Sequence, residues 1–105
     1  MFTHTMLVSF TSPISDSVLD QFLHDIESAM NASGVVRTFS SYRHVAVPGE
    51  EAIGAFIATA VLNFGVDTQG DLATLFAAPG AIDVIHKWQA DHPYKVAWVN
   101  YQADE

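Results

Sequence analysis

Alternating apolar and polar positions predict a β-strand at each end of the chain. Along residues 2–10 every second side chain falls on one face, namely Phe2, His4, Met6, Val8 and Phe10. Along residues 94–101 the faces alternate again, with Val96 and Trp98 on one and Ala97, Val99 and Tyr101 on the other. The N-terminal strand therefore has an apolar face into which a single histidine is set.

Apolar residues at helical spacing predict two helical regions. The first begins at a Ser15–Asp16 cap and ends at residues 31–34, and its apolar positions are Val18, Leu19, Phe22, Ile26 and Met30. The second begins where Thr68 and Asp71 have capping-box spacing. It is interrupted at Pro79 and ends before Pro93, so it is expected to consist of two pieces.

Between these helices the pattern predicts a β-rich stretch over residues 35–47, a loop over residues 48–51 and a strand over residues 56–64. The elements then follow the order β-α-β-β-α-β, which is typical of ferredoxin-like domains. We therefore expect an α+β fold with a four-stranded antiparallel sheet and helices on one face. At this length, residues 1–105 are expected to form a single domain.

The second face of the predicted sheet also has apolar positions. Ile57 and Val61 alternate with Leu62 and Phe64, whereas a sheet with one face in water alternates more cleanly. Charged residues make up 15% of the chain, against about 25% in an average domain. We therefore expect a homodimer in which the two open sheet faces pack together and close a dimeric α/β barrel.

Composition excludes several classes of function. Four Lys and Arg against twelve Asp and Glu give a net charge of −8, which leaves no basic surface for nucleic acid. The lack of Cys excludes disulfides, thiolate zinc sites and cysteine nucleophiles. His86 and His92 match no metal-ligand spacing, and no glycine-rich phosphate loop follows a strand, so no metal or cofactor is expected. No apolar run is long enough to span a membrane, and a cytoplasmic location is expected.

Two arginines near the second predicted strand have two interpretations. Arg37 and Arg43 would line the mouth of a barrel and bind an anion, or they would pair with Asp or Glu across the dimer. Because acidic residues outnumber basic residues three to one, the pairing is favoured.

Four segments share their order and spacing with a known family. They are residues 4–10, residues 34–45 with Phe39 and Arg43, residues 75–79, and residues 96–101. Together they resemble the stress-responsive A/B barrel (dimeric α/β barrel, Dabb) domain family over nearly the whole chain. The resemblance implies a homodimer whose two sheets close into a barrel.

The resemblance does not carry one known activity of that family. A plant polyketide cyclase of the family uses a Tyr and a His, without metal or cofactor, but the matching positions here are Leu75, Ala78 and Ala81. Related barrels include cofactor-free monooxygenases, for which no residue here is a specific marker. Asn100 stands where the family usually has Asp, so it can form hydrogen bonds but cannot act as a carboxylate base.

His4 is the predicted catalytic residue. An imidazole at the end of an apolar cleft has a pKa near working pH and can act as a general base, and the resemblance also places a pocket histidine there. The alternative is a histidine that is hydrogen-bonded to backbone near a strand end. Trp98 would form a wall for a flat aromatic ligand, or it would pack in the core. The predicted ligand-binding residues are His4, Met6, Val8, Phe22, Ile26, Trp98 and Asn100.

Two functions of different classes remain open. In the first, a small apolar or aromatic molecule binds between sheet and helices, with cyclase, isomerase or monooxygenase-like chemistry that needs no cofactor. In the second, the protein is structural or stress-protective, has a filled interior and binds no ligand. A third function, as an effector-sensing module, would need a DNA-binding partner chain. A cavity of about 300 Å³ or more beside His4 would distinguish the first from the second.

Overall fold

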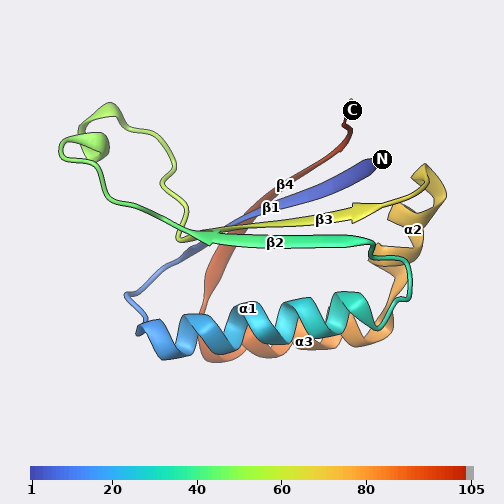
Figure 1. Cartoon of the computed structure of the whole chain (residues 1–105). Helices are drawn as coiled ribbons and strands as arrows, with labels where there is room; N and C mark the ends of the chain where they lie inside the picture. Colours follow the sequence, from blue (N-terminus) through green and yellow to red (C-terminus); the bar gives the residue numbers. More distant parts are fainter. Residues whose placement is uncertain (104–105) are drawn as a thin grey trace.

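The computed structural model describes residues 1–103, which form one sheet covered on one face by three helices (Figure 1). The elements in chain order are β1 (Phe2–Phe10), α1 (Asp16–Asn31), β2 (Thr38–Arg43), a 3₁₀ helix η1 (Glu50–Ile53), β3 (Ala60–Val66), α2 (Gln69–Ala77), α3 (Pro79–Asp91) and β4 (Tyr94–Gln102). This arrangement confirms the α+β, ferredoxin-like prediction.

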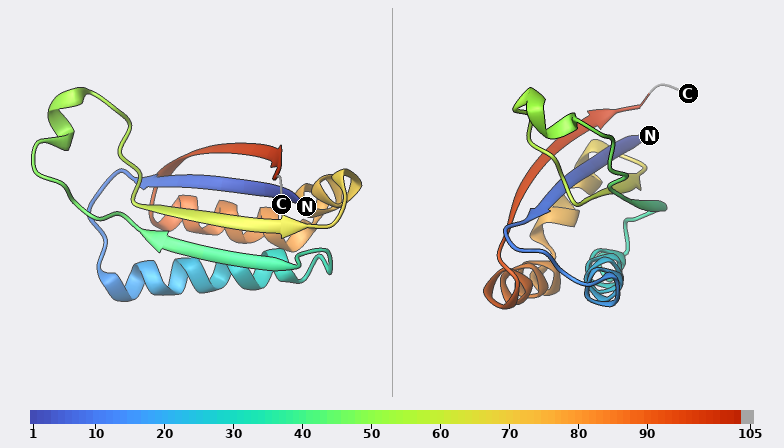
Figure 2. Two further views of the ribbon diagram at one scale, coloured as in Figure 1. Left: turned by 45° about the horizontal axis from the view of Figure 1, so that its top comes forward. Right: turned by 90° about the vertical axis from the view of Figure 1, so that its left-hand side faces the viewer.

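The sheet has the strand order β2-β3-β1-β4, and every neighbouring pair is antiparallel. The register pairs His4 with Phe64 of β3 on one side and with Asn100 of β4 on the other. Because side chains alternate along a strand, these positions share the face that α1 and α3 cover. Figure 2 shows the two layers, with the sheet above the two long helices.

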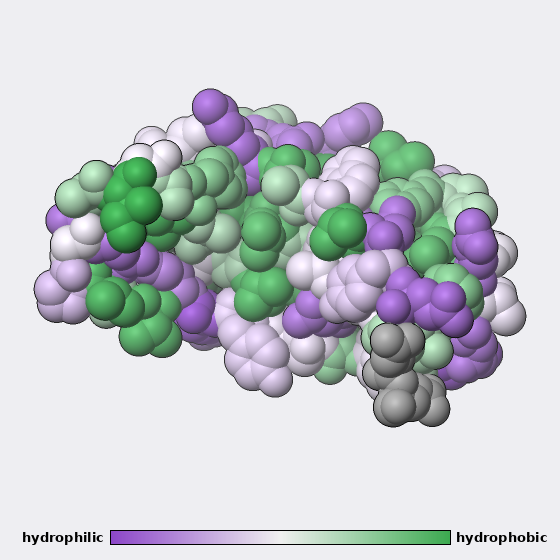
Figure 3. All heavy atoms as spheres, turned by 90° about the horizontal axis from the view of Figure 1, so that it is seen from above, coloured by the Kyte–Doolittle hydropathy of each residue, from purple (hydrophilic) through white to green (hydrophobic). Residues whose placement is uncertain are grey.

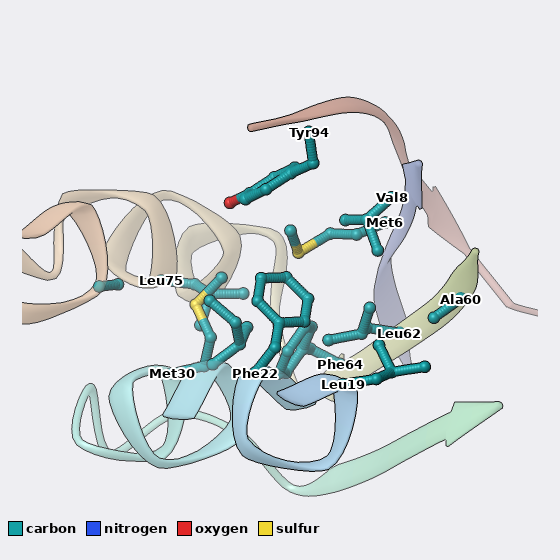
Figure 4. Close-up of a cluster of buried hydrophobic side chains, with 12 residues drawn as sticks. Met6, Val8, Leu19, Phe22, Met30, Ala60, Leu62, Phe64, Leu75 and Tyr94 are labelled. Atoms are coloured by element: carbon teal, nitrogen blue, oxygen red, sulfur yellow. The ribbon is translucent and has the colours of Figure 1, made fainter. Parts of the chain in front are cut away.

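The core lies between that face of the sheet and the helices. Met6, Val8 and Leu62 from the strands meet Phe22 and Ile26 of α1, and each of these side chains is almost wholly buried. Figure 4 shows the buried side chains pointing toward one another across this space. The alternation of β1 and the helical spacing of α1 therefore predicted the same layer correctly.

The predicted helix starts are confirmed by their caps. The Ser15 hydroxyl accepts a hydrogen bond from the Val18 N–H at the start of α1. At the start of α2, Thr68 and Asp71 form a reciprocal capping box, which satisfies two backbone N–H groups that a helix end leaves open. Pro79 begins α3, where its missing N–H costs no helical hydrogen bond.

The predicted limits of the middle strands are wrong. β3 runs over Ala60–Val66 instead of residues 56–64, and β2 covers only Thr38–Arg43 within the predicted 35–47 stretch. Pairing between the two strands ends at Arg43 and Ala60, with one further backbone hydrogen bond from His44 to Thr59. Beyond that point the chain leaves the sheet, so Phe56 has no strand partner and is exposed.

The segment that leaves the sheet, residues 44–59, is called the arm below. It rises on the side of the sheet opposite to the helices (Figure 1), and it includes η1 where the sequence predicted a plain loop. Gly49 and Gly54 flank η1 with φ values of 84° and 78°, a backbone conformation that favours glycine. The arm thus adds a folded projection that the β-α-β-β-α-β pattern does not contain.

The open face of the sheet carries both apolar side chains and a polar row. Leu7, Val99, Tyr42 and Tyr101 are exposed on it. Between them runs a row with one residue from each strand, Tyr101, Thr5, Asn63 and Ser40, joined by hydrogen bonds of 3.3, 2.7 and 3.2 Å. Figure 3 shows this mixture of apolar and polar patches from above.

Among residues 1–103, no helix combines the length and apolar character that crossing a bilayer requires.

Candidate functional site

His4 is a polar side chain set into the buried face of the central strand β1. Its side chain is 1% exposed, because β1 lies between β3 and β4 and the helical layer covers it. The register places it directly opposite Asn100 on the edge strand β4. A buried histidine needs a hydrogen-bond partner, and this register supplies one.

The partner fixes which nitrogen of the His4 ring carries the proton. The Nδ1–H of His4 donates to the side-chain oxygen of Asn100 over 2.8 Å. Because that oxygen can only accept, the neutral ring keeps its lone pair on Nε2. The alternative, in which His4 bonds to backbone near a strand end, is not what the structure shows; the partner of His4 is a side chain on the neighbouring strand.

The surroundings of His4 also set its charge. Burial lowers the pKa of His4 below its ordinary value, and the hydrogen bond with Asn100 opposes this only in part. The ring is therefore neutral at pH 7. A neutral imidazole with a free Nε2 lone pair is the form that accepts a proton.

Three aromatic rings surround His4. The Phe76 ring meets it edge-on at 4.8 Å between centroids, the Trp98 ring lies at 5.9 Å, and the Phe64 ring is stacked at 6.1 Å. Trp98 is 56% exposed although it belongs to the helix-facing side of β4. The site therefore has a buried polar centre and one aromatic wall that is open to solvent.

The structure divides the predicted binding residues into two groups. His4, Trp98 and Asn100 lie together at one end of the sheet. Met6, Val8, Phe22 and Ile26 lie in the core instead, and none is more than 2% exposed.

Two cavities of ligand size lie at the other end of the sheet. One of about 520 Å³ is lined by residues of the β1–α1 connection and by Arg43, and one of about 400 Å³ lies between the arm and Tyr42. His4 lines neither of them, nor a third cavity of about 430 Å³ beside the start of β2, so none of the three is the cavity beside His4 that would favour ligand binding over a filled interior. None of the predicted site residues therefore lines either of these two cavities.

Both arginines pair with carboxylates of their own chain. Arg37 Nε lies 2.9 Å from the carboxylate of Asp67, and Arg43 pairs with Asp20 of α1. Both guanidinium groups are thus neutralised within the chain, which removes the basis for an anion site at the barrel mouth. The described residues contain no cluster of three or more His, Cys, Asp or Glu arranged to hold a metal ion.

Two further residues of this region are not among the candidates that the sequence pattern predicts. Phe76 lies against His4 because α2 packs over the end of β1. Tyr94 was placed only within a strand, yet among the described residues its hydroxyl is buried without a hydrogen-bond partner. Figure 4 shows that hydroxyl pointing away from its strand toward the helices. Neither fact has a signal in the sequence, because both depend on how the helices sit on the sheet.

Comparison with known proteins gives similarity in structure alone. No model of a known protein family matches the chain, and no curated protein matches it. Among solved structures, a hydroxynitrile lyase from Passiflora edulis superposes with a TM-score of 0.74 at 19% identity, covering 99% of this chain and 94% of its own. A Dabb family protein from Mesorhizobium loti gives 0.74 at 12% identity, covering 99% and 97%.

A third similar structure is described as a dimeric ferredoxin-like protein of unknown function, from Thermobifida fusca. It gives a TM-score of 0.73 at 7% identity, covering 97% of this chain and 90% of its own. At these identities the similarity is one of fold, and it confirms the fold that the four sequence segments indicated. This chain has the ferredoxin-like fold of the Dabb, or dimeric α/β barrel, proteins.

Proposed function

We propose that this protein is a homodimer that binds a small apolar or aromatic molecule beside His4, and that His4 acts there as a general base without a cofactor. The observation that carries the proposal is the buried, neutral His4 whose Nδ1–H is held by Asn100. That hydrogen bond leaves Nε2 free to take a proton. The reaction would be a proton transfer of the kind that isomerisation or cyclisation requires.

The aromatic rings around His4 support an aromatic ligand. Phe76 and Trp98 lie 5.6 Å apart and both contact the His4 ring. A flat ligand stacked on the exposed face of Trp98 would replace water there and would bring a C–H bond toward the imidazole. That one similar structure is an enzyme, the hydroxynitrile lyase, is consistent with chemistry on this fold.

The open sheet face supports a homodimer. Leu7, Val99 and Tyr101 are exposed on it, and burying them against a second sheet would remove their apolar surface from water. The similar structure from Thermobifida fusca is described as dimeric. Val99→Lys places a charge on this face, and we expect it to turn a dimer into a monomer in analytical ultracentrifugation.

Binding is tested through Trp98. In a Trp88→Phe background Trp98 is the remaining tryptophan, so its emission reports on this wall alone. Titration with phenylacetone and its longer acyl homologues should change that emission in a saturable way. His4→Ala should lower the affinity obtained from this titration. His24→Ala, on the exposed side of α1, should leave the affinity unchanged.

Proton transfer is tested by deuterium uptake. Phenylacetone incubated in D₂O should exchange its α-hydrogens faster with the wild-type protein than with His4→Ala, as followed by ¹H NMR. His24→Ala again serves as the matched control. Equal exchange rates for wild type and His4→Ala would rule out His4 as the base.

A second function has two observations in its favour, the first being that His4 lines none of the three ligand-sized cavities described above. Four of the predicted pocket residues, Met6, Val8, Phe22 and Ile26, fill the space between sheet and helices. A filled interior is what a structural or stress-protective protein without a ligand would have. Saturable binding at Trp98 would exclude this alternative.

A further inference from the structure

The arm has a defined fold that Glu50 holds together. Its carboxylate accepts the Val47 N–H over 2.6 Å and contacts the His44 ring over 2.7 Å. Both contacts lower the pKa of Glu50, and the hydrogen bond from the Val47 N–H has the larger effect. The carboxylate of Glu50 is therefore ionised at neutral pH. Two glycines with positive φ close the turns on either side of η1. The arm therefore presents its side chains from a folded backbone.

The arm presents apolar side chains to solvent. Four of them are between 55% and 81% exposed, namely Val45, Val47, Ile53 and Phe56. Both views in Figure 2 place the arm on the open side of the sheet, away from α1 and α3. Adjacent exposed apolar residues on one small projection are typical of a contact surface.

The open sheet face alone is small for a stable interface. Between six and nine residue positions pair neighbouring strands, so four strands have a flat footprint of roughly 20 Å by 20–30 Å, or roughly 400–600 Å². A stable interface of standard size buries about 800 Å² on each partner. A further surface on the same side of the sheet would enlarge such an interface, and the arm is on that side.

Charges indicate where the arm would lie. Lys95 is exposed on the open face, at the end of the edge strand β4 that is nearest to the arm's end of the sheet. Both arginines are paired within the chain, whereas the structure gives Lys95 no ion pair among the described residues. Glu51 is exposed on the arm and likewise has no ion pair among them. In a two-fold dimer with the axis along the strands, β2 lies over the partner's β4, which brings each arm to the partner's Lys95 end.

We propose that each arm packs on the second copy of this chain, with its apolar side chains against the partner's open face and Glu51 beside the partner's Lys95. This inference rests on the proposed homodimer and adds a second contact to it. The interface is then isologous, so every arm contact occurs twice. One substitution in the sequence therefore removes two contacts from the dimer.

The first test replaces the two most exposed apolar residues of the arm. Val45→Ser combined with Ile53→Ser should raise the dimer dissociation constant at least about tenfold in analytical ultracentrifugation, given the transfer free energy of buried aliphatic side chains. The matched control is Ile82→Ser, which removes an exposed apolar residue from α3 on the far side of the molecule. Circular dichroism confirms that each variant is folded.

The outcomes separate this inference from the homodimer itself. A wild-type protein that is monomeric at micromolar concentration overturns the homodimer. A dimeric wild type that dissociates with Val99→Lys but not with the arm double variant keeps the homodimer and overturns the role of the arm. Weaker association of the arm variant than of the Ile82→Ser control supports it.

The second test concerns the position of the arm. Lys95→Glu should weaken the dimer more than Lys87→Glu, which changes the net charge equally but lies on α3. Adding Glu51→Lys to Lys95→Glu should restore association because it exchanges the two charges. Equal weakening by the two lysine variants, or no restoration, overturns this placement.

Discussion

At the scale of single residues, the pair His4 and Asn100 determines the chemistry of the site. A carboxylate at position 100 would attract the protonated imidazole, whereas the amide holds the ring in one tautomer without adding a charge. Burial then keeps the ring neutral. The amide therefore favours a base over a permanently charged imidazolium.

The pKa of His4 should respond to substitution of its partner. Asn100→Ala removes the hydrogen bond that raises this pKa, so the value should fall further; Asn100→Asp adds a negative charge, so it should rise above the wild-type value. The ¹H NMR titration of the His4 ring measures both shifts. A wild-type His4 whose pKa is not below the ordinary value for histidine would contradict the assigned burial.

The pKa shift of His4 also has a consequence for stability. Its folded pKa is lowered, so the unfolded chain binds this proton more readily as the pH falls below about 6.5. The contribution of the neutral His4 ring to the free energy of unfolding is therefore fully present above that pH and is lost as the pH falls. Chemical denaturation across this range should show the loss in the wild type and a smaller loss in His4→Ala.

Tyr94 offers a second test at a single residue. Its hydroxyl is buried without a partner among the described residues, and burial raises its pKa to about 12. Tyr94→Phe should raise the free energy of unfolding by about 1 kcal/mol, because a buried unpaired hydroxyl is costly. Between pH 10 and 12 the unfolded chain ionises first, so wild type should lose stability by about 1.4 kcal/mol for each pH unit and the variant less. A variant less stable than wild type would mean that a bound water or ligand pairs with the hydroxyl.

Some residues of the site could be read from the sequence and others could not. The alternation of side chains along β1 places His4 on the buried face, and the alternation along β4 places Trp98 and Asn100 on the same face. The positions of these three residues therefore follow from strand patterns alone. The position of Phe76 depends on the rotation of α2 about its own axis, which no pattern in nine residues specifies.

At the scale of elements, caps defined the helices better than alternation defined the middle strands. Ser15, Thr68 and Pro79 each stand where a helix begins, because the backbone N–H groups there need a side-chain partner or none. The arm has apolar residues at strand-like spacing, so Phe56 and Ile57 extended the predicted β3 too far. In the structure Phe56 is exposed on the arm, and Ile57 is only partly buried beside it.

The capping box of α2 has a measurable effect. Thr68→Ala removes the hydroxyl that accepts the Asp71 N–H, and we expect the free energy of unfolding to fall by about 1 kcal/mol. Thr68→Ser keeps the hydroxyl and should keep most of the stability. Because α2 carries Phe76, the alanine variant should also loosen the packing on His4, which the chemical shifts of the His4 ring would report.

At the scale of the whole molecule, the net charge of −8 opposes association. Two copies repel one another, so salt should strengthen the proposed dimer by screening. Between about 20 mM and about 300 mM NaCl the Debye length falls from about 20 Å to about 6 Å, and the dissociation constant should fall with it. An association that weakens with salt would indicate that the Glu51–Lys95 contact outweighs the overall repulsion.

The polar row across the open face has a consequence for partner choice. Tyr101, Thr5, Asn63 and Ser40 bind one another within each sheet, so a facing surface must leave room for these groups or match them. A second copy of this chain presents the same row of polar groups and so matches it. A different protein of the same fold would cover these polar groups with side chains that do not match them. Where several such proteins occur in one cell, this row would sort them into pure pairs and suppress mixed assemblies.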